Sequence, residues 1–395
     1  MSDKNKQPHI DLDEYIRQGE PSQKEKASIW QTAIGLQDVD GLRTSDYLKA
    51  TACKHIEGEI DIDEARELIK RYYQSKTIRE PNDEEEQEAD KVSANITKIL
   101  SSQTLDFSTG GYISIHRRVF DGVFKHAGKV RDYDISKKEW VLDGDTVNYM
   151  NWEDLRRALD YDIYQEREFS YKGISTDAMV AHITRFVSGL WQIHAFCEGN
   201  TRTTAVFTIL YLRSIGFEVN NTLFARHSWY FRNALVRANY KNAIKGIDYT
   251  PVYLERFFRN LLLGEQWDLS NRYLHIHATD ELKVQPKLDT PTSAPQVKPI
   301  TPTSTPTSNK TISEPLSNTV RRLVLVIGQE ERSVREMMEA AGLKDRKNFL
   351  EYSLTPAIAE GLIRMKYPDS PRHPRQKYLL TVKGLTVYKG ISEGL

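Results

Sequence analysis

The sequence of 395 residues predicts a mainly α-helical protein that ends in a small, separate α+β domain. Apolar residues recur at helical spacing from 174 to 193, and residues 205–215 are apolar enough to form a buried helix. Residues 281–315 are dominated by Thr, Pro and Ser, a composition that cannot bury apolar area and is typical of an extended linker. We therefore expect a helical body before this segment and an independent domain after it.

Composition sets the outer limits on function. Charged residues make up 28% of the chain, its formal net charge is zero, and no run of about 18 apolar residues is present. The first residues carry no apolar signal core. We expect a soluble, cytoplasmic protein with no membrane partner. The two cysteines, Cys53 and Cys197, exclude a disulfide framework and a cysteine-rich metal site.

Two segments upstream of residue 174 carry local patterns. The charge run Glu80–Asp90 predicts a solvated loop or the start of a helix. Within Lys137–Tyr149, the apolar run Trp140–Leu142 is followed by Asp-Gly-Asp. A short strand, a Gly turn and a second strand form a hairpin signal, so we expect a β-hairpin there.

The densest chemistry lies in residues 194–202, which read His-Ala-Phe-Cys-Glu-Gly-Asn-Thr-Arg. This segment falls between the two expected core helices, and its Gly turn opens a helix whose free N–H groups favour phosphate. His194 can accept a proton near neutral pH, Glu198 is a hard oxygen ligand suited to Mg²⁺, and Arg202 can grip phosphate oxygens with a bidentate fork. A base, a metal ligand and a phosphate-binding cation together indicate nucleotide transfer to a hydroxyl, although a core histidine beside a structural turn would also account for these residues.

The segment resembles the signature of the Fic family, His-x-Phe-x-(Asp/Glu)-Gly-Asn-Gly-Arg-x-x-Arg. The resemblance extends over roughly Ile29–Gln266 and implies a Fic-type helical bundle with a β-hairpin flap. It also implies an enzyme that transfers AMP from ATP to a Ser, Thr or Tyr hydroxyl of a target protein. In such an enzyme His194 would deprotonate the target hydroxyl, Phe196 would anchor the loop, and Glu198 would hold Mg²⁺ on the α- and β-phosphates. The residues that would bind the nucleotide phosphates are Gly199, Asn200 and Thr201, as the anion hole, and Arg202, on the outer phosphates.

Two positions depart from the family pattern. Thr201 replaces the second Gly, which a helix-opening turn tolerates if φ stays negative. Ala205 stands where the family has its second Arg, the residue that grips the γ-phosphate. This loss leaves room for another nucleotide or a different transfer. The base, the metal ligand and the first Arg are intact, so we expect an active enzyme.

The resemblance also assigns roles outside the signature. In the family the hairpin, here Lys137–Tyr149, docks a segment of the target protein by strand addition; a surface hairpin without that role is the alternative. Residues Tyr230–Tyr240 resemble the helix that lines the adenine pocket, which makes Tyr230 and Asn239 candidate nucleotide-binding residues.

Residues 52–58 resemble the family's inhibitory helix, (Ser/Thr)-x-x-x-Glu-(Gly/Asn), with Cys53 in place of the Ser or Thr. There Glu57 would be the inhibitory residue, although its usual arginine partner is missing at Ala205. Inhibition would then act through charge and bulk near Arg202, and Glu57→Gly is expected to raise self-modification. On this basis residues 1–95 form an N-terminal helical regulatory region, and residues 96–280 form the Fic-like catalytic core.

The last 80 residues, 316–395, carry 14 Lys/Arg against 9 Asp/Glu, a surplus of five. The patterns predict a helix at 318–327, a second that begins at a Ser333–Glu336 capping box, a third at 345–361, and two strands around a Pro/Arg loop at 368–375. Three helices and a basic hairpin resemble a winged-helix domain, which binds either DNA or protein. The residues that would face DNA phosphates are Lys344, Arg346, Lys347, Arg372, Arg375 and Lys377.

The sequence thus predicts a protein adenylyltransferase with ATP as substrate, Mg²⁺ as cofactor and N-terminal autoinhibition. Two alternatives stay open. Ala205 suggests a Fic-type enzyme that uses another nucleotide or removes AMP. The C-terminal domain suggests a DNA-binding regulator whose Fic core senses nucleotide.

Overall fold

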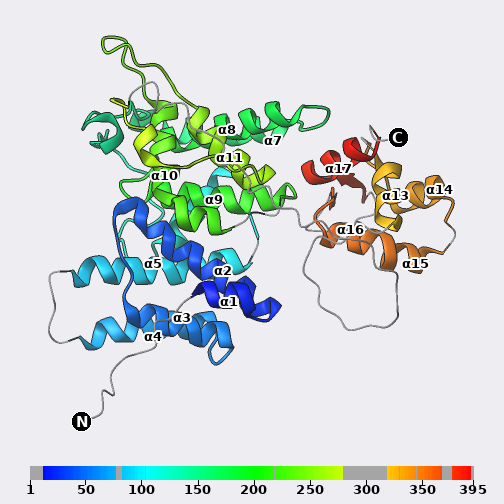
Figure 1. The fold of residues 1–395 in the computed structure, drawn as a ribbon, viewed down its shortest axis with the longest axis horizontal. Coiled ribbons are helices and arrows are strands. Elements are labelled where there is room, and N and C mark those ends of the chain that lie inside the picture. The colour runs from blue at the N-terminus through cyan, green and yellow to red at the C-terminus, as the bar shows by residue number, and fades with distance from the viewer. Residues whose placement is uncertain are drawn as a thin grey trace, which may run out of the picture. The chain divides into compact units, whose positions relative to one another are not determined.

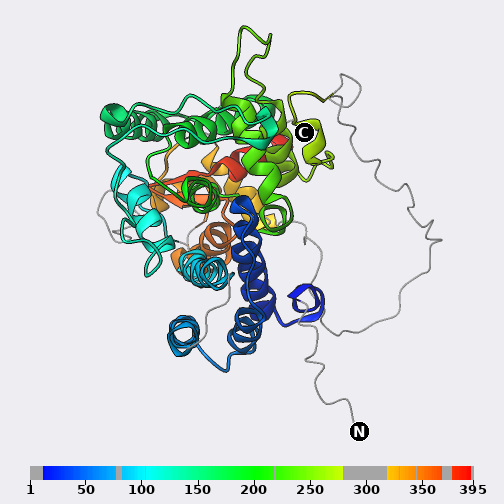
Figure 2. The same cartoon turned by 90° about the vertical axis from the view of Figure 1, so that its left-hand side faces the viewer.

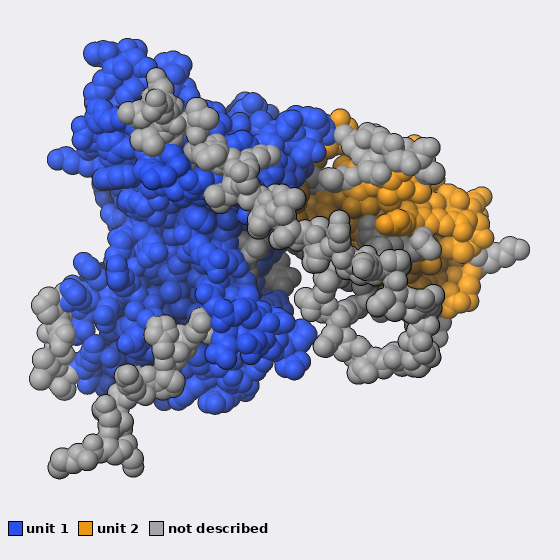
Figure 3. Space-filling model, viewed as in Figure 1, with its two compact units in different colours: residues 1–170, 174–214, 219–286 blue, residues 171–173, 215–218, 287–395 orange. Residues whose placement is uncertain are grey.

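The computed structural model describes residues 12–76, 82–102, 104–217, 219, 221–278, 318–328, 330–343, 345–366 and 376–392. The chain divides into two compact units, drawn in separate colours in Figure 3: residues 1–170, 174–214 and 219–286, and residues 171–173, 215–218 and 287–395. The described residues are mostly helical, as predicted. The predicted linker, residues 281–315, lies outside the described residues.

The first unit begins with helices that share a small apolar core around Trp30, Leu48 and Ile69. Ser45 caps the start of α3, and Asp61 forms a capping box with Glu64 at the start of α4. Helix α5 begins within the predicted charge run and continues past residue 95, so one helix crosses the predicted boundary between the N-terminal region and the catalytic core. The elements are α1 (Leu12–Gln18), α2 (Pro21–Gly35), η1 (Leu36–Asp40), α3 (Asp46–Glu57), α4 (Ile62–Ser75) and α5 (Asp83–Ser102).

The rest of this unit is built around α9, which is buried at every position from Asn200 to Leu212. Helix α8 starts at the Ser175 cap and packs against α7, α9, α10 and α11, while α2 packs along α5 and α10 (Figure 1, Figure 2). The apolar stripe predicted between 174 and 193 is the buried face of α8. The elements are α6 (Thr109–Val119), η2 (Trp140–Leu142), η3 (Trp152–Asp154), α7 (Leu155–Glu168), α8 (Thr176–Ile193), α9 (Asn200–Ser214), α10 (Asn221–Asn239), α11 (Val252–Leu263) and η4 (Asn271–Tyr273).

The predicted β-hairpin at Lys137–Tyr149 folds back on itself but forms no strands. The Glu139 amide donates to the Asp145 carbonyl at 3.0 Å, and a 3₁₀ turn, η2, replaces the first strand. Val141 and Leu142 are neighbours and both fully buried, which does not fit a surface strand that alternates between a buried and an exposed face. Asp143 then takes a left-handed conformation, with φ 56°. We refer to residues 137–149 as the flap loop.

The second unit contains the predicted order of helices followed by two strands. The Ser333–Glu336 capping box is present at α14, and the predicted third helix is interrupted by a π-helical stretch, η5, just before Pro356. Strands β1 and β2 pair antiparallel, with Arg364 opposite Leu379. Lys344, Arg372 and Arg375, predicted to face DNA, lie outside the described residues. The elements are α13 (Asn318–Ile327), α14 (Val334–Ala341), α15 (Arg346–Phe349), η5 (Leu350–Leu354), α16 (Thr355–Ala359), β1 (Ile363–Met365), β2 (Tyr378–Leu380) and α17 (Val382–Ser392).

Across the described ranges, no helix combines the length and the apolar character needed to cross a bilayer.

Candidate active site

His194 lies at the C-terminal cap of α8 in a left-handed conformation, with φ 51°. Its ring packs on Tyr149 of the flap loop, with ring centroids 4.0 Å apart, and edge-on to Trp191. Nδ1 lies 3.3 Å from the Trp191 carbonyl oxygen, which can only accept, so Nδ1 carries the proton. Nε2 is therefore the lone-pair nitrogen, and this buried atom has no hydrogen-bond partner within the described part of the chain.

Electrostatics keep His194 neutral. Burial lowers the pKa of its imidazole well below the ordinary value, and the nearby charges of Lys137, Arg232 and Arg131 lower it further. At pH 7 the imidazole is therefore neutral and its lone pair is unprotonated, which is the form that a general base requires.

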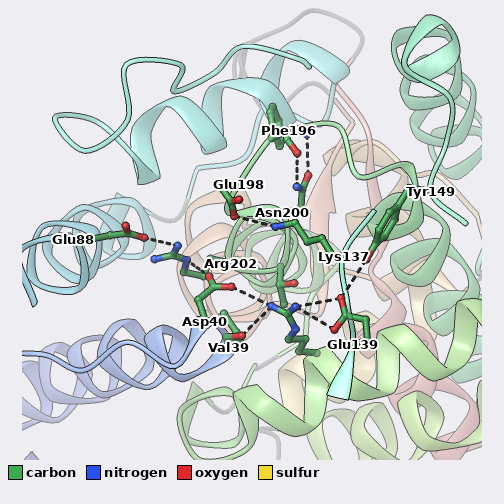
Figure 4. A network of polar contacts seen from close by, with 12 residues as sticks. Val39, Asp40, Glu88, Lys137, Glu139, Tyr149, Phe196, Glu198, Asn200 and Arg202 are labelled. Atoms are coloured by element: carbon green, nitrogen blue, oxygen red, sulfur yellow. Dashed lines mark hydrogen bonds and ion pairs between the residues drawn. The ribbon is translucent and has the colours of Figure 1, made fainter. Parts of the chain in front are cut away.

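The loop after His194 is fixed by its own side chains. Asn200 closes a ring with Phe196: the Phe196 amide donates to Asn200 Oδ1 at 2.9 Å, and Asn200 Nδ2 donates to the Phe196 carbonyl at 2.7 Å (Figure 4). Phe196 is fully buried and stacks on His116, with centroids 3.8 Å apart. Arg131 adds a clamp, because its Nε donates to the His194 carbonyl at 2.8 Å. The family-derived role of Phe196 as the anchor of this loop agrees with these contacts.

The turn into α9 has the backbone conformation that its sequence predicts, with a helix-opening Gly and a negative φ at Thr201. Gly199 takes φ +74°, and a Cβ at that position would lie 2.1 Å from the Phe120 ring. Thr201 avoids positive φ, and its hydroxyl accepts a hydrogen bond from the Trp191 indole at 3.0 Å. The first turn of α9, with Gly199, Asn200 and Thr201, thus offers backbone N–H groups without intrahelical acceptors next to His194.

His116 supports the loop from α6. The Gly128 amide donates to His116 Nδ1 at 2.8 Å, which leaves Nε2 as the protonated nitrogen that donates to the Glu198 carbonyl at 3.1 Å. Burial lowers the pKa of His116 to about 4.

We expect this lowered pKa to make the protein less stable in mild acid. Between pH 6.5 and 4 the unfolded chain binds a proton at His116 that the folded chain does not, so the free energy of unfolding falls as the pH falls. The loss approaches about 3 kcal/mol at the low end. Urea unfolding at pH 7 and pH 5 should show a smaller drop for His116→Gln than for wild type. Equal drops would show that His116 does not titrate in this window.

Glu198 is the carboxylate with the chemistry to hold Mg²⁺. Its side chain is 54% exposed and pairs with Lys137 of the flap loop, with Nζ 2.9 Å from Oε2. In the described ranges no group of three or more His, Cys, Asp or Glu side chains could hold a metal by itself. A lone, accessible carboxylate fits Mg²⁺, which is held by one or two carboxylates together with substrate phosphates.

Arg202 is occupied by N-terminal residues. It is 2% exposed, and its Nη2 lies 2.7 Å from Glu88 Oε1 on α5. Its Nε lies 2.8 Å from Asp40 Oδ2, at the end of η1, and Nη1 donates to Gln37 Oε1 at 3.0 Å. Figure 4 shows the guanidinium between Asp40 and Glu88. The side chain predicted to hold the outer phosphates is thus paired with two carboxylates.

The second oxygen of Asp40 reaches another arginine, Arg232 on α10. Arg232 Nη1 lies 3.1 Å from Asp40 Oδ1, and Nη2 lies 3.1 Å from Glu139 Oε2 of the flap loop. Glu139 also accepts a hydrogen bond from the Tyr149 hydroxyl at 3.2 Å. Burial acts to lower the pKa of Arg232, but Glu139 and Asp40 outweigh it, so the pKa is raised and the charge is held.

Of the two residues predicted to bind the nucleotide from α10, one lines a pocket and the other does not. Asn239 lines a polar pocket of about 200 Å³ between the flap loop and the end of α10, together with Asp145, Gln192 and Tyr240. Tyr230 is not brought to this pocket: it is fully buried, and its hydroxyl donates to the Tyr253 carbonyl at 3.2 Å, because its face of α10 packs on α11.

Glu57 is not brought to the signature either. It lies at the exposed end of α3, where Gln23 of α2 donates to its Oε2 at 2.9 Å. The carboxylates that meet Arg202 are Asp40 and Glu88, which the sequence reasoning missed. One signal was available, because Asp40-Gly41 repeats the acidic–Gly pattern of Glu57-Gly58.

Arg232 and Glu139 were also missed. Both lie in segments to which the resemblance assigned a role, Arg232 in Tyr230–Tyr240 and Glu139 in Lys137–Tyr149. No local pattern, however, places α10 and the flap loop on either side of a carboxylate from η1.

These features define an α-helical domain in which the loop at residues 194–202 presents a base, a carboxylate and the start of a helix that can bind an anion. Residues 106–212 match the family model described as the Fic/DOC family, and residues 318–381 match the model for the C-terminal domain of the Fic-like protein "filamentation induced by cAMP". The chain therefore carries a Fic/DOC family domain and a Fic-like C-terminal domain. The match to the Fic/DOC family model supports a Fic-type enzyme, and Fic family enzymes generally use a nucleotide substrate.

Solved structures of Fic proteins are similar to the chain at low identity. A Fic family protein from Desulfovibrio desulfuricans G20 is 15% identical over 93% of this chain and 90% of that one, with a TM-score of 0.40. The N-terminal Fic domain of a putative cell filamentation protein (VirB-translocated Bep effector protein) from Bartonella quintana is 18% identical over 47% of this chain and 84% of that one, with a TM-score of 0.35. No curated protein matches the chain.

Proposed function

We propose that the protein is an adenylyltransferase that transfers AMP from ATP to a hydroxyl side chain of a target protein, and that its own N-terminal carboxylates hold it inactive. The observation that carries this proposal is the state of His194. Its buried Nε2 has a free lone pair beside the N-terminal turn of α9, where a phosphate is favoured.

The chemistry follows from these groups. His194 Nε2 takes the proton of the target hydroxyl while the oxygen of that hydroxyl forms a bond to the α-phosphorus. The bond from the α-phosphorus to the bridging oxygen breaks, and pyrophosphate leaves with the electron pair. The N–H groups at Gly199–Thr201 stabilise the charge on the α-phosphate oxygens. Glu198 would hold Mg²⁺, which when bound neutralises phosphate charge.

We further propose the places of the nucleoside and of the target. The polar pocket at Asn239, Tyr240 and Gln192 offers hydrogen-bonding groups for the nucleobase. This pocket lies close to His194 along the chain, since Gln192 comes two residues before His194. The target segment would lie along the flap loop, beside Tyr149 and Lys137, where its hydroxyl would come within reach of the base.

Inhibition, in this proposal, acts through Arg202. Asp40 and Glu88 occupy two nitrogens of the guanidinium group that would otherwise bind phosphate, and their negative charges repel an approaching triphosphate. The inhibitory role that the sequence suggested for Glu57 would thus belong to Asp40 and Glu88.

One observation favours a second candidate within the same class. Position 205 is Ala, so the second arginine that the family signature places there for the γ-phosphate is absent. A nucleotide other than ATP is therefore the alternative substrate.

The test is incubation of the full chain with Mg²⁺ and α-³²P-ATP, with each other α-labelled nucleoside triphosphate in parallel. We expect label on protein with ATP and its loss in His194→Ala, whose thermal melting should match that of wild type. Label that persists in His194→Ala would contradict the proposal. Transfer from another nucleotide only would keep His194 as the general base and replace ATP as the substrate.

A further inference from the structure

Two buried arginines from different helices share one carboxylate in the site. Asp40 Oδ2 lies 2.8 Å from Arg202 Nε on α9, and Asp40 Oδ1 lies 3.1 Å from Arg232 Nη1 on α10. The Arg202 and Arg232 side chains are 2% and 14% exposed. A carboxylate with one oxygen on each guanidinium occupies the place of a bridging anion.

The two guanidinium groups keep unused donors in this arrangement. The Nε atoms of Arg202 and Arg232 are both buried, and neither makes a well-aligned hydrogen bond within the described residues, although Arg202 Nε is ion-paired with Asp40. Buried donors without acceptors are costly in a folded protein. A phosphate has more oxygen acceptors than a carboxylate, so it could align with these two donors better than Asp40 does.

The charges require one carboxylate to leave before an anion binds. Three carboxylates, Asp40, Glu88 and Glu139, face the two arginines. Asp40 is the most exposed of them, at 26% against 23% for Glu88 and 2% for Glu139. It also ends η1 beside Gly41, where a Cβ would meet no atom within 4 Å, so no side chain packs over this end of the turn. Asp40 is the carboxylate that can be displaced.

We propose that Arg232 is a phosphate-binding residue of the nucleotide site, paired with Arg202, and that Asp40 stands in for the phosphate in this structure. Arg232 thereby supplies, from α10, the second guanidinium that Ala205 removes from the signature. This inference rests on the proposed function for the identity of the ligand as a nucleoside triphosphate. The paired-arginine anion site itself rests on the geometry of Asp40.

The experiment measures binding by calorimetry in the full chain, with Mg²⁺, for three probes: ATP, inorganic tripolyphosphate and adenosine. The variants are Asp40→Asn, and Asp40→Asn combined with Arg232→Gln or Arg232→Lys. A matched control, Arg226→Gln in the Asp40→Asn background, removes an arginine from the same helix whose side chain is 62% exposed.

We expect Asp40→Asn to bind ATP and tripolyphosphate about tenfold more tightly than wild type, and Arg232→Gln to reverse that gain by about tenfold or more. Adenosine binding should stay the same in all variants, and Arg226→Gln should change none of the three affinities. Arg232→Lys should fall between Arg and Gln, because it keeps the charge but loses the planar fork.

Two results would overturn the inference. One is equal tripolyphosphate affinity with and without Arg232. The other is an equal loss of adenosine and ATP binding, which indicates a structural role. If Arg232→Gln fails to fold, Arg232→Lys decides between these outcomes. Phosphate binding that depends on Arg232, without AMP transfer, would refute the proposed function and leave this inference standing. AMP transfer at the same rate with and without Arg232 would support the proposed function and refute this inference.

Discussion

Replacing Asp40 and Glu88 by their amides should raise AMP transfer, including self-modification, by about tenfold or more. Each carboxylate makes a charge-assisted contact with Arg202, and such contacts contribute about 1.5–3 kcal/mol, where 1.4 kcal/mol is a factor of ten in affinity. Asn and Gln keep the shape and remove the charge, so Arg202 stays packed on Phe120 but becomes available to phosphate. The measurement is initial-rate incorporation of α-³²P-AMP at an ATP concentration below saturation.

Two controls separate release of Arg202 from general loosening of the N-terminal helices. Asp38→Asn alters an exposed carboxylate on the same turn, η1, that pairs with neither arginine, and it should leave the rate unchanged. Glu57→Gly should also have little effect, because Glu57 contacts Gln23 rather than the signature. A large rise in Glu57→Gly, with none in the Asp40 and Glu88 variant, would return the inhibitory role to Glu57.

Gly199→Ala should abolish transfer and destabilise the first unit. The left-handed conformation costs an L-residue about 1–2 kcal/mol, and forcing a methyl group into the Phe120 ring adds about 1–3 kcal/mol of overpacking. The Phe120 ring lies against both Arg202 and His116, so its displacement disturbs two supports of the site. Thermal melting and the α-³²P-AMP assay together measure both effects.

The matched control is Gly122→Ala. Gly122 has a similar φ of +70°, but a Cβ there would meet no atom within 4 Å. Gly122→Ala therefore reports the conformational strain alone. A melting temperature as low as that of Gly199→Ala would mean that contact with Phe120 contributes nothing.

The helical fold and the signature loop were predictable because both depend on short sequence separations. The apolar stripe from Met179 to Trp191 sets the buried face of α8, and the Ser333–Glu336 capping box starts α14, each through residues within one helix. His194, Glu198 and Arg202 fall within nine residues, so one turn and one helix start bring them to the same place. The prediction failed where neighbouring residues were both buried, as at Val141 and Leu142 in the flap loop.

The carboxylates that pair with Arg202 and Arg232 were not predictable in the same way. Residues 1–95 contain two acidic–Gly pairs, Asp40-Gly41 and Glu57-Gly58, and both glycines end their elements in a left-handed conformation. The local pattern is the same at both, and only the packing of α2 against α5 and α10 decides which carboxylate meets Arg202. Arg232 is separated from Asp40 by 192 positions, a distance at which a single sequence gives no pairing signal.

Asp40 ends a short turn that follows α2 directly, so the exposure of Arg202 is coupled to the folding equilibrium of the N-terminal helices. Local opening of α2 removes Asp40 from Arg202, and the free energy of that opening sets how often the guanidinium is uncovered. Residues of the apolar core around Trp30 and Leu48 touch no reacting group. If Asp40 inhibits as proposed, these residues nevertheless set the resting activity, because weakening this core populates the opened state. Under that proposal, temperature and distant substitutions in these helices are expected to act as effectors of the site.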